Sequence, residues 1–157
     1  MQQEFSHISS AGQPKMVSVS DKAVTLRTAR AEARVWLGPD IAAKVSGTEL
    51  MSRKGPVFQT AIIAGTMGAK KTSDLIPFCH PLPLEDCQIS IELEGETAVI
   101  NGVVQVTGRT GVEMEALAAV AIAALTVYDM CKAMSHAIRI EHVLLLEKTG
   151  GKSDFRR

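Results

Sequence analysis

The chain has 157 residues, of which 46% are hydrophobic and 22% are charged, and this composition excludes a disordered chain, a collagen-like repeat and a coiled coil. Its 17 lysines and arginines balance its 17 aspartates and glutamates, which argues against a whole face that attracts nucleic acid or an acidic membrane. Any anion-binding site must therefore be local.

The composition predicts one domain over residues 1–157, with an appendage at each end. Residues 1–20 are mixed and polar and are predicted to form an arm, and residues 148–157 form a tail rich in glycine and lysine. Three cysteines without a Cys-x-x-Cys pair, and a start without an apolar signal core, indicate a reducing, cytoplasmic compartment. The longest apolar stretch, residues 116–127, falls short of the ~18–20 residues of a membrane span, so no membrane role is expected.

In chain order, the first predicted elements are a strand, a short helix and a longer helix. Residues 23–37 favour a strand because β-branched and aromatic residues stand near both ends. A Gly-Pro-Asp sequence then breaks the strand and caps a short helix over residues 41–45. Residues 57–71 repeat small and apolar side chains every three or four positions, as a helix with a packed face does, and Gly65 and Gly68 would allow close backbone packing.

The second half of the chain predicts a stiff loop, a hairpin, a long helix and a last strand. Three prolines within residues 76–83 exclude a helix there and hold the chain extended. Residues 87–93 and 98–107 alternate in polarity on either side of a Gly-Glu-Thr turn, which predicts a β-hairpin. Residues 112–134 are rich in alanine and leucine and predict a helix, and residues 137–146 predict the final strand.

This order of elements is strand, helix, strand, strand, helix, strand. It is typical of an α+β ferredoxin-like split βαβ sandwich, with an antiparallel sheet and helices on one face. Two stretches nearly match a P-loop, at residues 65–72 and 146–153, but Lys70 and Leu146 occupy positions where that loop requires glycine. P-loop nucleotide hydrolysis is therefore excluded.

Lysines gather at the predicted ends of elements. If these ends converge, the lysines form a compact anion-binding cradle without any net charge on the chain. The alternative is that each lysine complements a helix dipole, an effect of ~0.3–1 kcal/mol. The lysines concerned are Lys54, Lys70, Lys132, Lys148 and Lys152.

The proline-rich loop holds His80 beside Cys79. A rigid backbone would fix the imidazole at a constant depth, which suits a proton-transfer group or a metal ligand. No second His or Cys lies three or four residues away, so the sequence does not favour a metal site. A half-buried loop histidine without chemistry is the alternative.

The long helix carries acidic groups near both ends. Asp129 and Lys132 are neighbours at i, i+3, so the ammonium can keep the carboxylate ionised. Glu115 lies ~21 Å from Asp129 along the helix axis, so no single reacting atom can touch both. Either they serve the two ends of a long substrate, or two protomers share sites; we prefer the second, which predicts an obligate oligomer. The alternative for Glu113 and Glu115 is simple complementarity to the helix dipole.

Four stretches carry a resemblance to a known family: KKTSDLIPFCHPL at 70–82, TGVEMEAL at 110–117, YDMCKA at 128–133 and KTGGKS at 148–153. They are long and specific, and they resemble the MoaC family, the cyclic pyranopterin monophosphate synthases of molybdenum-cofactor biosynthesis. The similarity covers essentially the whole chain. It departs from the family pattern at Phe78, where leucine is common, and after Ser153, where an intervening glycine is often found.

The resemblance implies a ferredoxin-like fold assembled as a homo-hexamer, a trimer of dimers, with active sites between protomers. It implies a GTP-derived substrate, 3′,8-cyclo-7,8-dihydro-GTP, which is rearranged to cyclic pyranopterin monophosphate with release of pyrophosphate. No cofactor is implied. Assistance by a divalent cation stays an open alternative, because the sequence shows no dedicated set of ligands for one.

The resemblance also assigns candidate site residues. Asp129 and Lys132 match the acid–base pair of the family. The full set of catalytic candidates is Asp129, Lys132, His80, Lys54 and Glu113. The substrate-binding candidates are Phe78, Cys79, His80, Met114, Glu115, Lys70 and Lys152.

Two other functions were weighed against this one. A ferredoxin-like module that senses a nucleotide without chemistry would use the same lysines for binding alone. A sheet that binds RNA needs stacking aromatic side chains on its strands. Only 4% of the residues are aromatic and none lies in residues 87–93 or 98–107, so we expect no nucleic-acid partner.

Overall fold

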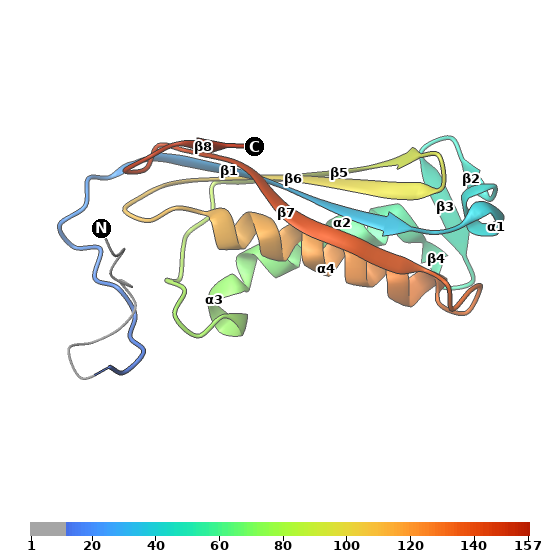
Figure 1. Ribbon diagram of the computed structural model, residues 1–157, viewed down its shortest axis with the longest axis horizontal. Coiled ribbons are helices and arrows are strands. Elements are labelled where there is room, and N and C mark those ends of the chain that lie inside the picture. The colour runs from blue at the N-terminus through green and yellow to red at the C-terminus, as the bar shows by residue number, and fades with distance from the viewer. Residues whose placement is uncertain (1–11) are drawn as a thin grey trace.

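The computed structural model describes residues 12–157, so the first eleven residues of the predicted arm lie outside the described part. A five-stranded antiparallel sheet forms one layer, in the order β5-β6-β1-β7-β8 (Figure 1). Its first four members have the strand order of the split βαβ arrangement, which confirms the predicted ferredoxin-like α+β class. The strands are β1 (Thr25–Trp36), β5 (Asp86–Glu94), β6 (Thr97–Gly108), β7 (Arg139–Thr149) and β8 (Phe155–Arg156).

Two long helices, α2 (Val57–Lys70) and α4 (Glu113–Cys131), cover one face of this sheet (Figure 1). The alternation of β1 explains the close fit, because its inward side chains are small and fully buried from Ala29 to Val35. On the neighbouring strand, a Cβ on Gly102 would come within 2.8 Å of a Val120 methyl group. Small residues on the sheet therefore set how near α4 lies.

The two helices also pack tightly against each other. A Cβ on Gly65 would lie 2.7 Å from the carbonyl oxygen of Ala119, and a Cβ on Gly68 would lie 2.9 Å from the Cβ of Ile122. Neither position has room for a side chain. The prediction that these glycines permit close backbone approach is confirmed.

The long helix α4 is apolar on most of its surface. Its length and composition alone would allow it to cross a membrane, so the sequence-based statement that every apolar stretch is too short was wrong by this criterion. In the structure α4 packs on α2 and on three strands of the sheet, with Ala116 and Val127 fully buried. The apolar composition of α4 is therefore that of a helix in the hydrophobic core.

A second, three-stranded sheet stands at one end of the molecule and was not predicted. It consists of β2 (Val45–Ser46), β3 (Glu49–Ser52) and β4 (Gly55–Pro56), in that order. The short helix α1 (Pro39–Ala42) precedes it and begins two residues earlier than predicted, because the fixed φ of proline suits the first helical position. The predicted end of that helix, Val45, is already a strand residue.

Most of the other predicted elements are confirmed, with shifted ends. The proline-rich stretch after the short helix α3 (Thr72–Leu75) is not helical, as expected. The last strand β7 runs beyond its predicted end to Thr149 and pairs with β8, so four of the ten residues of the expected tail belong to the sheet. Gly150, at φ 80°, lies in the turn between them, and its N–H donates to Asp154 Oδ1 at 3.0 Å.

Candidate active site

The sequence-predicted site residues lie in two groups at opposite ends of α4. Glu115 and Asp129 are separated along this unbroken helix by ~21 Å, as helix geometry requires. The structure brings together Phe78, Cys79, His80, Glu113, Met114, Glu115 and Lys152 near the start of α4. It brings together Lys54, Asp129 and Lys132 at the end of α4.

The first group lines a cavity of about 350 Å³ between the proline-rich loop and the first turn of α4. The loop contributes Phe78, Cys79 and His80, and the helix contributes its first three residues. Val17 and Val19, from the segment before β1, close another side. The cavity therefore combines apolar walls with an imidazole, a thiol and two carboxyl groups.

Glu115 is the unusual group of this cavity, because only 4% of it is exposed. Burial raises the pKa of its carboxyl group to about 7, and the negative charge of Glu113 acts in the same direction. The pKa of the Cys79 thiol is also raised, by burial and then by Glu115. A carboxyl group that titrates near neutral pH can both donate and accept a proton there.

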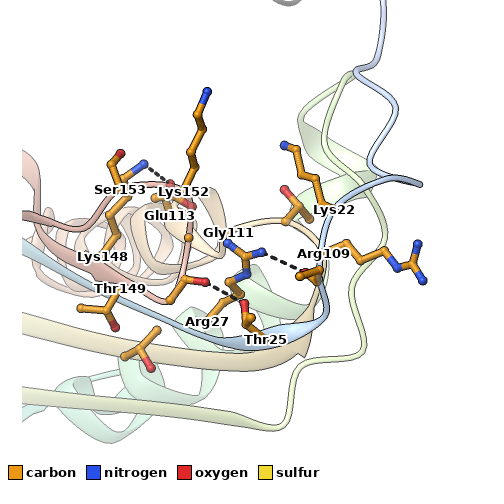
Figure 2. Close-up of a pocket in the computed structure, with 15 residues that line it drawn as sticks. Lys22, Thr25, Arg27, Arg109, Gly111, Glu113, Lys148, Thr149, Lys152 and Ser153 are labelled. Carbon is orange, nitrogen blue, oxygen red and sulfur yellow. Dashed lines mark hydrogen bonds and ion pairs between the residues drawn. The ribbon is translucent and has the colours of Figure 1, made fainter.

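A second, cationic cavity of about 490 Å³ adjoins the first (Figure 2). The two share Lys22, Thr110, Gly111 and Glu113 among their lining residues, so they are adjacent. The basic residues that line the second cavity are Lys22, Arg27, Arg109, Lys148 and Lys152. Glu113 is its only acidic lining residue within the described chain. The local excess of positive charge suits a polyanion.

Glu113 links the two cavities. Its Oε1 pairs with Lys148 Nζ at 3.0 Å, and Figure 2 shows Lys148 directed toward it. A Cβ on Gly111 would lie 1.9 Å from Glu113 Oε2, so only glycine lets the carboxylate take this place. The start of β1 meets the β7–β8 turn at the same cavity, because Thr25 Oγ1 donates to the carbonyl oxygen of Gly150 at 2.7 Å.

Sequence reasoning missed three of the cations, Lys22, Arg27 and Arg109. Arg27 is only 8% exposed, and its guanidinium donates at 3.3 Å to the carbonyl oxygens of Gly108 and Ala23. A signal was present, because Arg27 lies in phase with the buried alanines of β1 and is therefore directed inward. Arg109 Nη1 donates to the carbonyl oxygen of Ser20.

At the far end of α4, Asp129 accepts from two lysines. Lys132 Nζ lies 2.8 Å from its Oδ1 and Lys54 Nζ lies 2.6 Å from its Oδ2. These contacts lower the pKa of Asp129 to about 2, and Asp129 raises the pKa of Lys132. About half of each of the three side chains is exposed. The cluster is therefore open to a ligand and keeps its charges at neutral pH.

The lysines expected to form one cradle are thus divided. Lys148 and Lys152 line the cationic cavity, and Lys54 and Lys132 meet at Asp129. Lys70 ends α2 and lines neither of the two cavities. Among residues 12–157, no three His, Cys, Asp or Glu side chains form a group that could hold a metal ion.

Comparisons with known proteins find relatives over almost the whole chain. A model of the MoaC family matches residues 16–151. The chain is 51% identical to a cyclic pyranopterin monophosphate synthase of Xanthomonas axonopodis pv. citri, over 96% of this chain and 92% of the relative. It is 47% identical to part of a molybdenum cofactor biosynthesis bifunctional protein of Synechocystis, over 96% of this chain and 45% of that protein. It is 45% identical to part of molybdenum cofactor biosynthesis protein 1 of Dictyostelium discoideum, over 96% of this chain and 27% of that protein.

Proposed function

The chain belongs to the MoaC family, and we propose that it is a cyclic pyranopterin monophosphate synthase, a phosphorus–oxygen lyase of molybdenum-cofactor biosynthesis. It converts 3′,8-cyclo-7,8-dihydro-GTP into cyclic pyranopterin monophosphate and releases pyrophosphate. The observation that carries this proposal from the geometry is the pair of adjacent cavities at the start of α4. One cavity is cationic, and the other holds proton-transfer groups among apolar walls.

The cationic cavity suits the triphosphate of this substrate. When a substrate hydroxyl oxygen attacks the α-phosphorus, the bond to the β-phosphate breaks and pyrophosphate leaves with the electron pair. Negative charge then grows on the departing oxygens, and cations held nearby stabilise it. Arg27, Lys148 and Lys152 are placed to supply them, and Glu113 holds the Lys148 ammonium in position.

The neighbouring cavity suits the heterocycle. Rearrangement of a cyclised dihydropurine needs groups that donate and accept protons at neutral pH. Glu115 is the strongest candidate in the chain, because its pKa of about 7 lies near the working pH. His80 lines the same cavity and provides a second proton-transfer group.

Asp129, Lys132 and Lys54 complete the site, in our proposal, from a neighbouring protomer. The three groups lie too far from Glu115 in one chain to act on the same atoms. We propose a homo-hexamer, a trimer of dimers in the cytoplasm, in which the end of one α4 meets the start of another. Apolar side chains exposed near both ends of α4 support an interface there: Met114 is 39% exposed and Met134 is 38% exposed.

The proposal is tested by incubating the purified protein with 3′,8-cyclo-7,8-dihydro-GTP and measuring pyrophosphate and the fluorescent oxidised pterin. Both products are expected at equal amounts. A ligand-sensing module would bind this compound and return it unchanged, so binding without pyrophosphate release would overturn the proposal.

A further inference from the structure

The loop that carries Lys54 is weakly held by its own backbone. Lys54 lies at the tip of the hairpin between β3 and β4, where only Ser52 with Gly55 and Met51 with Pro56 are paired. Because proline has no N–H, Met51 and Pro56 form the non-hydrogen-bonded pair of this short ladder. A hairpin of this length is marginal by itself. Something else must fix where Lys54 lies.

The start of α2 has a matching deficiency. The first N–H groups of a helix have no partner within the helix, and a side chain at the N-cap usually accepts one of them. The N-cap of α2 is Pro56, which makes no such bond. The N–H groups of Phe58 and Gln59 therefore need an acceptor from elsewhere in the chain.

Glu49, at the start of β3, meets both needs. Its Oε1 accepts from the N–H of Phe58 at 2.8 Å, and its Oε2 accepts from the N–H of Gln59 at 3.0 Å. Its Oε1 also accepts from the N–H of Leu50 at 2.7 Å. Through these bonds the Glu49 carboxylate joins the start of β3 to the first turn of α2.

The chain from Glu49 to Lys54 is held at both of its ends. Leu50 is fully buried and Phe58 is 3% exposed, so two of the three residues that donate to the carboxylate are anchored in the core. At the hairpin tip, Ser52 Oγ accepts from the N–H of Lys54 at 3.1 Å and donates to the carbonyl oxygen of Gly55 at 3.1 Å. These bonds define the backbone from which the Lys54 side chain extends.

The ammonium of Lys54 has few contacts of its own. It lies 2.6 Å from Asp129 Oδ2 and 3.2 Å from the Asp129 carbonyl oxygen, and its side chain is 52% exposed. Few contacts restrict the rotamers of this long, half-exposed side chain, and fixing them costs conformational entropy. The position of the Lys54 ammonium therefore depends on where the hairpin backbone lies.

We infer that Glu49 is a positioning residue, whose carboxylate clamps the β3–β4 hairpin to the start of α2 and thereby holds Lys54 against Asp129. The inference rests on the proposed function only in the catalytic use of Lys54. The juxtaposition itself is a property of the chain without substrate.

The first test uses no substrate. We expect the Asp129 pKa, about 2 in the natural chain, to rise in Glu49→Gln, because an amide cannot accept at both of its atoms and Lys54 is released. Carboxyl-carbon NMR titration measures it. Glu92→Gln, the same change at an exposed position of β5, is the control and should leave the Asp129 pKa unchanged. An unshifted Asp129 pKa in folded Glu49→Gln overturns the inference.

The second test uses turnover in two backgrounds. A displacement of about 1 Å at a reacting group costs up to ~100-fold, so we expect Glu49→Gln to lower kcat about 10–100-fold with little change in KM. In a Lys54→Gln background the same change should lower kcat less than about twofold, because the group that it positions is already gone. An equal fall in both backgrounds would show a merely structural role and overturn the inference.

A second variant, Ser52→Ala, keeps the inference testable if Glu49→Gln does not fold. Ser52→Ala loosens the hairpin tip without touching α2 and should give the same dependence on Lys54. If the Asp129 pKa rises in Glu49→Gln while turnover is unchanged, the positioning by Glu49 stands and the catalytic use of Lys54 fails.

Discussion

Two carboxyl groups of one helix have pKa values shifted in opposite directions because their surroundings differ. Glu115 is buried beside Glu113, which raises its pKa to about 7, and Asp129 is exposed between two lysines, which lower its pKa to about 2. A group that stays ionised at every working pH is a poor proton donor. Asp129 therefore suits charge stabilisation, whereas Glu115 suits proton transfer.

The charge state of Glu115 predicts a pH dependence of stability. Below about pH 4.5 the group is protonated in both folded and unfolded chains, and between about 4.5 and 7 only the folded chain keeps the proton. The free energy of unfolding therefore falls as pH rises through this window, by about 3 kcal/mol. Urea unfolding at pH 5 and pH 7, at one protein concentration, measures the fall. Glu115→Gln should remove it, and an identical slope in this variant would contradict the raised pKa.

Substitution of Asp129 is predicted to lower turnover and to leave stability nearly unchanged. Its two ion pairs are half exposed, and exposed pairs contribute little to stability, so Asp129→Asn should leave the melting temperature nearly unchanged. Turnover should fall ~100-fold or more, because the lysines lose the carboxylate that holds them. Asp40→Asn, on the exposed first turn of α1, is the matched control. Pyrophosphate release within twofold of the natural chain would remove Asp129 from the site.

At the residue scale, sequence reasoning found the site residues that stand in one motif. It missed the residues that are close in space but distant in the sequence. Glu113 and Glu115 stand in one short stretch, and the cavity brings both to its wall. Lys22 and Arg27 reach the cationic cavity only because β1 pairs with β7, which ends more than a hundred residues later. Such long-range pairing has no local signal in one sequence.

Among the elements, those with several repeats of a period were predicted and the shortest ones were not. The residues of α2 show three- and four-residue spacing over its whole length, and β5 alternates cleanly. The strands β2 and β4 have two residues each, too few for any period. The Glu49 carboxylate joins β3 to the start of α2, through contacts that periodicity does not report.

Close packing of α2 on α4 predicts a severe effect of one added methyl group. Alanine favours an exposed helix by ~1 kcal/mol over glycine, yet the Gly65→Ala methyl would lie 2.7 Å from the Ala119 carbonyl oxygen. The cost of overpacking therefore exceeds the gain in helix propensity, and the free energy of unfolding should fall by about 1–3 kcal/mol. Thermal unfolding measures the change. Met67→Ala, at an exposed position on the same helix, is the control, and a stabilised Gly65→Ala protein would show that the helices are not in contact there.

For the whole molecule, the order of elements predicted the topology because the split βαβ arrangement is one of few that bury both helices on a single sheet. Helix length also predicted that the candidate site residues lie in two separate groups, since an unbroken α4 keeps its ends apart. The two adjacent cavities could not be predicted, because their walls come from the segment before β1, the proline-rich loop and the β7–β8 turn.

A divided site predicts that two inactive chains restore each other. Asp129→Asn damages the end of α4 and Glu115→Gln damages its start, and each variant alone should have lost at least ~99% of its turnover. If each site takes one end from either of two protomers, random assembly of both variants leaves about a quarter of the sites intact. Co-expression of the two chains with different affinity tags, followed by tandem purification, isolates the mixed assemblies. Their turnover should approach the intact fraction, whereas chains that each hold a complete site would stay as inactive in the mixture as they are alone.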